Sequence, residues 1–110
     1  MKFQIADLYP YEDSGIAAVI ERQYRKLQRQ KGEPIEVLII DGDILVVDGN
    51  NTAFAAKLLG KREIEGKQIS RQDIRPYRDA LETAKSKGQR GYVNWPVDNE
   101  YGERAKRYGR

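Results

Sequence analysis

Residues 46–64, VVDGNNTAFAAKLLGKREI, pass from an apolar run through Asp48 and Gly49 into two asparagines and a threonine. Alanine, phenylalanine and leucine then recur at helical spacing as far as Gly60, which is a typical helix stop. The segment therefore predicts a buried strand, a turn and a helix that begins near Asn51.

The turn at this point is a candidate anion site. A helix that begins near Asn51 leaves its first backbone N–H groups unpaired, and its dipole adds about half a positive charge there. Gly49 has no Cβ, so a ligand could approach the backbone, and Asn50, Asn51 and Thr52 offer neutral hydrogen bonds. These features predict a phosphate or carboxylate site. An asparagine that caps the helix is the competing explanation.

The other elements follow from periodicity and turn residues. We expect a short strand at 2–8, a loop at 9–15, a helix capped by Ser14 and stopped by Gly32, and strands at 34–40 and 44–49. The Asp41-Gly42 pair favours a hairpin between these two strands. A strand at 62–69 and a helix at 77–88 come next. This order predicts an α+β chain, with one domain in residues 1–75 and a C-terminal helix and basic arm in residues 76–110.

The charge is unevenly placed. The net charge is +3; residues 1–75 carry 12 Lys/Arg against 12 Asp/Glu, and residues 76–110 carry 8 against 5. This excess favours contact of the C-terminal third with nucleic acid, and solubility is the competing explanation. The candidate nucleic-acid residues are Arg90, Arg104, Lys106 and Arg107. The arm from residue 89 has no clear period, so it is either packed through Tyr92, Val93 and Trp95 or partly disordered.

The composition excludes several kinds of chemistry. The chain has no cysteine and no histidine, so disulfides, thiol chemistry and zinc sites built on these residues are excluded. Any metal would be a hard ion such as Mg²⁺ held by oxygen atoms. No apolar run has the length of a membrane span or the form of a signal peptide, so we expect a cytoplasmic protein without membrane contact.

Residues 34–64 resemble the ParB/sulfiredoxin superfamily. ParB-like proteins carry G-E-R-R-x-R-A-A-K-L-x-G where this chain has Gly49 to Gly60, and both glycines and the Ala-Ala-Lys-Leu run coincide without a gap. The resemblance covers about residues 3–70. It implies a mixed sheet whose hairpin leads into a helix N-terminus, with a nucleotide or phosphate at that point. The nucleotide is CTP in partition proteins and ATP in sulfiredoxins and related free-amino-acid kinases.

The chain departs from the superfamily at two kinds of position. The sulfiredoxin reaction needs a cysteine in this segment, so that activity is excluded. The arginines of the partition proteins fall on Asn51, Thr52 and Phe54, so the charge-assisted bonds that they make are missing.

Glu12 is a candidate catalytic residue. Relatives with phosphotransfer activity resemble this chain in having a glutamate just after the proline of the first loop, here Pro10-Tyr11-Glu12. Such a carboxylate could accept a proton from a hydroxyl group, or hold Mg²⁺ together with Asp48. In the competing explanation Glu12 and Asp13 complement the positive end of the first helix, and Asp48 belongs to an ordinary turn.

Several functions therefore compete. The leading one is binding of a nucleotide, ATP or CTP with Mg²⁺, or of a phosphate group at Gly49 to Thr52. A magnesium-dependent phosphotransferase or nucleotide hydrolase with Glu12 as base is an alternative. Others are a nucleic-acid-binding module acting through the C-terminal third, and an interaction or regulatory domain with a degenerate site. A homodimer could form through an exposed sheet edge or through the arm.

Overall fold

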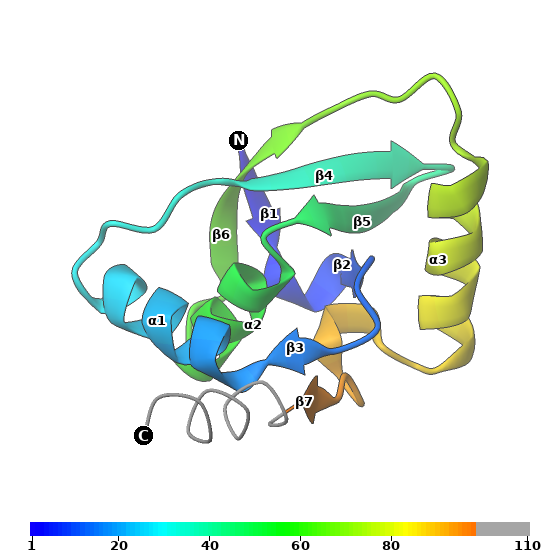
Figure 1. Cartoon of the computed structure of the whole chain (residues 1–110). Helices are drawn as coiled ribbons and strands as arrows, with labels where there is room; N and C mark the ends of the chain where they lie inside the picture. Colours follow the sequence, from blue (N-terminus) through cyan, green and yellow to red (C-terminus); the bar gives the residue numbers. More distant parts are fainter. Residues whose placement is uncertain (99–110) are drawn as a thin grey trace, which may run out of the picture.

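The computed structural model describes residues 1–98, which form a curled five-stranded sheet with three helices (Figure 1). The sheet strands are β1 (Lys2–Gln4), β2 (Leu8–Pro10), β4 (Ile35–Ile40), β5 (Asp43–Asp48) and β6 (Glu63–Gln68). The helices are α1 (Ala17–Gln28), α2 (Asn50–Leu58) and α3 (Arg75–Ser86), and the 3-10 turns are η1 (Ile5–Asp7) and η2 (Arg90–Tyr92). The short strands β3 (Gly15–Ile16) and β7 (Val97–Asp98) pair separately.

The sheet is mixed, as the resemblance implies. Its order is β1-β6-β4-β5-β2, with antiparallel pairs β1/β6 and β4/β5 and parallel pairs β6/β4 and β5/β2. The predicted hairpin at Asp41-Gly42 is confirmed. Both residues are left-handed, with φ values of 51° and 86°, as the turn that best matches the twist of two strands requires.

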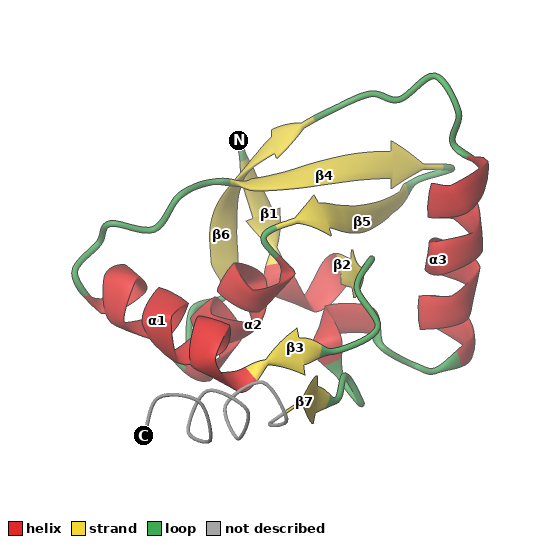
Figure 2. Ribbon diagram, in the orientation of Figure 1, coloured by secondary structure: helices red, strands yellow, loops and turns green. Residues whose placement is uncertain are grey.

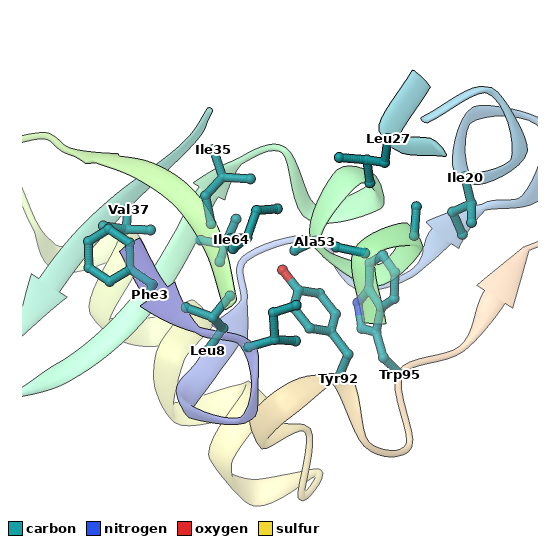
Figure 3. Packing of buried hydrophobic residues seen from close by; sticks show 14 residues of the cluster. Phe3, Leu8, Ile20, Leu27, Ile35, Val37, Ala53, Ile64, Tyr92 and Trp95 are labelled. Carbon is teal, nitrogen blue, oxygen red and sulfur yellow. The ribbon is translucent and has the colours of Figure 1, made fainter. Parts of the chain in front are cut away.

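Two apolar cores lie on the two faces of the sheet. Successive side chains of a strand point to opposite faces, so Val46 enters the core beneath α1 and α2, and its neighbour Leu45 enters the core beneath α3. Figure 2 shows α1 and α2 together and α3 apart from them. The larger core also takes in Tyr92 and Trp95 from the C-terminal segment (Figure 3).

The expected strand at 2–8 and loop at 9–15 are wrong in part. The chain leaves the sheet at η1 and re-enters it as β2, which pairs in parallel with β5. Pro10 does not prevent this, because β2 is an edge strand, where a missing N–H removes no ladder bond on the open side.

The expected ends of the first helix are also wrong. Helix α1 begins at Ala17, with Ile16 rather than Ser14 as its N-cap, because Gly15 and Ile16 pair with β7 first. At the other end Gln30, not Gly32, adopts the left-handed conformation after the last turn, with a φ of 58°. The expected stops at Gly60 and Gly88 are confirmed.

The segment after α3 packs onto the body of the protein. Tyr92 and Trp95 are 2% and 5% exposed, as the packed-arm prediction requires, whereas Val93 is 50% exposed and is not an anchor. The Tyr92 hydroxyl donates to Asn50 Oδ1 at 2.7 Å, and Trp95 Nε1 donates to the Glu12 carbonyl oxygen at 2.9 Å. Residues 99–110, with Arg104, Lys106 and Arg107, lie outside the described part.

Within residues 1–98, no helix has the length and apolar character needed to cross a membrane.

Removing the Tyr92 hydroxyl tests this anchor. Tyr92→Phe leaves the buried Asn50 carbonyl oxygen without its donor, so we expect a loss of about 1–3 kcal/mol in the free energy of unfolding by urea. Tyr24→Phe is the matched control, because Tyr24 also packs on this core and its hydroxyl has no partner among residues 1–98. Equal losses of unfolding free energy in the two variants would show that the hydrogen bond from Tyr92 to Asn50 does not stabilise the fold.

A comparison of the wild-type protein with Tyr92→Phe also predicts how stability depends on pH. Burial raises the pKa of Tyr92 well above its usual value, so the folded state keeps the proton after the unfolded chain has lost it. The advantage of wild type over Tyr92→Phe is therefore fully present below pH about 10. It then falls by up to about 1.4 kcal/mol per pH unit above that value. Urea unfolding of both proteins at pH 8 and pH 11 checks this, and a constant difference would argue against it.

Candidate functional site

A cleft of about 400 Å³ opens where β5 ends and α2 begins. Its walls come from the loop and helix start between Glu12 and Val19, from Glu33 and Pro34, and from Val47 to Thr52. The structure thus brings Glu12 to the same cavity as Asp48 and the Gly49–Thr52 turn, more than thirty residues further along the chain. Glu33 and Ser14 line it as well, although neither was among the predicted site residues and Ser14 was expected only to cap the first helix.

The N-terminus of α2 is uncapped. The N-cap is Gly49, with φ 94° and ψ 24°, and no side chain accepts a bond from the first turn. The first helical bond runs from Ala53 N to the Gly49 carbonyl oxygen at 2.9 Å. Within residues 1–98, the N–H groups of Asn50, Asn51 and Thr52 have no acceptor, so they remain available to a ligand.

Both asparagines of the turn are used inside the protein. Asn50 is 3% exposed; its Nδ2 donates to the Val46 carbonyl oxygen at 3.0 Å, and its Oδ1 accepts from Tyr92. Asn51 Oδ1 accepts from Ile16 N at 2.9 Å. The capping explanation is therefore wrong, since neither side chain caps α2. Asn51 Nδ2 has no partner in the part of the chain described. Of the two asparagine side chains, it is the one whose NH₂ group remains available to a ligand.

Gly49 is explained by packing as well as by backbone conformation. A Cβ at this position would lie 2.7 Å from Ile35 Cγ2, so it would point into strand β4. The expectation that the missing Cβ leaves room for a ligand is wrong, because that space belongs to Ile35. The residue is required because φ is left-handed and because β4 passes directly beneath the turn.

The cleft is acidic. Glu12, Glu33 and Asp48 line it, and no Lys or Arg does so among residues 1–98. Glu12 and Asp13 precede the first turn of α1, which itself contains no acidic residue, so the helix-dipole explanation stays a prediction. No group of three His, Cys, Asp or Glu in residues 1–98 could hold a metal by itself. A metal held by Glu12 and Asp48 would need further oxygen atoms from a ligand or from water.

The loop that carries Glu12 is fixed by the C-terminal segment. Besides the bond from Trp95 to the Glu12 carbonyl oxygen, Gly15 N donates to the Pro96 carbonyl oxygen at 2.9 Å. These two contacts fix the backbone of the loop from which Glu12 lines the cleft. The sequence could not show this, because the contacts join segments about eighty residues apart.

The predicted nucleic-acid residue within the described part is Arg90. Its guanidinium is exposed and forms an ion pair with Asp7 at 3.0 Å. Arg90 does not line the cleft at the start of α2.

No protein-family model matches the chain, and no curated protein matches it. Solved structures do. Sulfiredoxin from Arabidopsis thaliana superposes with a TM-score of 0.60 at 16% identity, over 74% of this chain and 94% of that one. Protein Atu1540 from Agrobacterium tumefaciens superposes with a TM-score of 0.52 at 11% identity, over 77% of this chain and 47% of that one. The chain has a ParB/sulfiredoxin-like fold. Sequence identities this low show that the fold is similar and show nothing about function.

The packing role of Gly49 can be tested against Gly42. Both glycines are left-handed, but a Cβ at Gly42 meets nothing within 4 Å, whereas one at Gly49 meets Ile35. We expect Gly49→Ala to cost about 1–3 kcal/mol more than Gly42→Ala in urea unfolding, since only the former overpacks the core. Similar losses would show that backbone conformation alone requires the glycine.

Proposed function

We propose that the protein binds a phosphate-bearing ligand together with Mg²⁺ in the cleft at the N-terminus of α2, with ATP and CTP as the candidate nucleotides. The observation that carries this proposal is the uncapped first turn of α2, which opens into a cleft of about 400 Å³. This volume lies within the range of small-molecule sites.

The phosphate would be held by hydrogen bonds rather than by cationic side chains. Three backbone N–H groups, Asn51 Nδ2 and the Thr52 hydroxyl are the available donors, and none of them has a partner in residues 1–98. The helix dipole adds partial positive charge at the same point. This donor set suits one phosphate group.

The negative charge of the cleft walls is the reason for including a metal ion in the proposal. A bare polyphosphate in this cleft would meet Glu12, Glu33 and Asp48 without a compensating Lys or Arg among residues 1–98. Mg²⁺ is commonly bound by one or two carboxylates together with ligand phosphates, and Glu12 and Asp48 fit that pattern. Glu12 and Asp48 would hold the ion, whose charge would offset that of the acidic wall beside the phosphate.

The proposal is one of binding. Glu12 as a general base for phosphotransfer or hydrolysis stays a prediction, whose signature is a magnesium-dependent loss of ATP or CTP. Contact of the C-terminal third with nucleic acid also stays a prediction, whose signature is steeply salt-dependent binding.

Calorimetric titration with ATP, CTP and inorganic phosphate, each with and without Mg²⁺, tests the proposal. We expect a triphosphate to bind only with Mg²⁺, and Thr52→Val to weaken it about tenfold, because a hydrogen bond to a charged group is lost. Asp48→Asn and Glu12→Gln should weaken the magnesium dependence. The matched control is Glu82→Gln on α3, which removes the same charge far from the cleft. Absence of binding at millimolar ligand, or tighter binding without Mg²⁺, would overturn it.

A further inference from the structure

We propose that a second cavity, at the opposite end of α2, binds a small organic anion that consists of a negatively charged head group on an apolar body. The cavity measures about 470 Å³ and lies between η1, the last turn of α2 with the residues that follow it, and η2. It shares no lining residue with the cleft at the start of α2. The inference is therefore independent of the function proposed above.

The lining of this cavity carries a concentration of positive charge. Lys57, Lys61, Arg62 and Arg90 line it, and within residues 1–98 no acidic residue does. Arg90 forms an ion pair with Asp7, and Lys57 Nζ donates a hydrogen bond to the Gly91 carbonyl oxygen at 2.8 Å. The side chains of Lys61 and Arg62 have no hydrogen bond or ion pair in the described part, and both also line a neighbouring cavity that includes Glu33, Glu63 and Glu65.

The remainder of the lining is largely apolar. Ile5 and Ala6 come from η1, and Val93 follows η2. Val93 is 50% exposed, although Tyr92 directly before it and Trp95 two residues after it are buried. A cavity lined by both apolar residues and cations differs from an ordinary solvated basic face. It matches the usual pattern of a ligand site, with apolar walls and a few convergent polar groups.

The wall of the cavity is held rigidly. Gly91 and Tyr92 both have left-handed backbone, with φ values of 66° and 64°, which is unusual for a large residue such as tyrosine. Burial of Tyr92 and its bond to Asn50 hold this conformation in place. Gly91 also lies so close to η1 that a Cβ would stand 3.1 Å from the Ala6 backbone. Sparsely populated backbone that the surroundings fix is found most often at binding sites.

These features together specify the ligand class. The anionic head group would pair with Lys61 and with Arg62, whose planar guanidinium can make two parallel bonds to a carboxylate. The apolar body would cover Val93 and rest against Ile5 and Ala6. Because the wall is preformed, little ordering would accompany binding.

The probe for the test is 2-naphthoate, followed by ¹H–¹⁵N NMR of the whole chain. We expect saturable shifts of the backbone amides of Ala6, Gly91 and Val93. We expect about tenfold weaker binding of the neutral 2-naphthalenemethanol and of the double variant Lys61→Gln/Arg62→Gln, since both lack the charged pair. The control, Lys26→Gln/Arg29→Gln at the exposed C-terminal end of α1, removes the same charge elsewhere and should bind like wild type.

Four results would overturn the proposal. Equal binding of the alcohol and the acid would show that the cations take no part. Equal weakening in the two double variants would show only general electrostatic attraction. Inorganic phosphate that binds as tightly as 2-naphthoate would show that the apolar lining takes no part. Shifts confined to the amides of Asn50 to Thr52 would place the ligand in the first cleft.

Discussion

The buried hydrogen bond from Tyr92 to Asn50 links the C-terminal segment to the start of α2, beside which the candidate cleft lies. Asn50 stands at the first position of α2 and also donates to the Val46 carbonyl oxygen in strand β5, so one amide joins the sheet, the helix and the C-terminal segment. Because the Tyr92 side chain is buried, the bond is shielded from water, and breaking it would leave a polar group without a partner. The position of α2 and the path of residues 89–98 therefore depend on each other.

The start of α2 is uncapped because its N-cap residue is Gly49, which has no side chain. The side-chain oxygens of the two asparagines that could have capped it are bonded to Tyr92 and to the backbone of Ile16. The first N–H groups of the helix have no acceptor within residues 1–98, and their residues line the cleft. The acidic residues around them explain why a metal ion belongs in the proposal, since the dipole and neutral donors alone would have to overcome three carboxylates.

Local signals in the sequence predicted much of the fold. The Asp41-Gly42 hairpin, the three helices and the strand after Gly60 follow from turn residues and periodicity, and the superfamily resemblance correctly implied the mixed sheet. The gathering of Glu12, Asp48 and the Gly49–Thr52 turn at one cleft was anticipated as well. The features that could not be predicted depend on contacts between distant parts of the chain. Strand β2 forms because β5 offers an edge, and α1 starts late because β3 pairs with β7. Asn50 accepts its hydrogen bond from a tyrosine 42 residues away.

The central claim is that the first turn of α2 contacts phosphate. It is tested most directly by the backbone amide resonances of Asn50, Asn51 and Thr52 during titration of the wild-type protein with MgATP and with MgCTP. We expect these three amides to show the largest shifts of all assigned residues and to saturate together, because their N–H groups would donate to the ligand. If they stay unmoved at saturating nucleotide, or if the largest shifts fall elsewhere, the cleft is not the phosphate site.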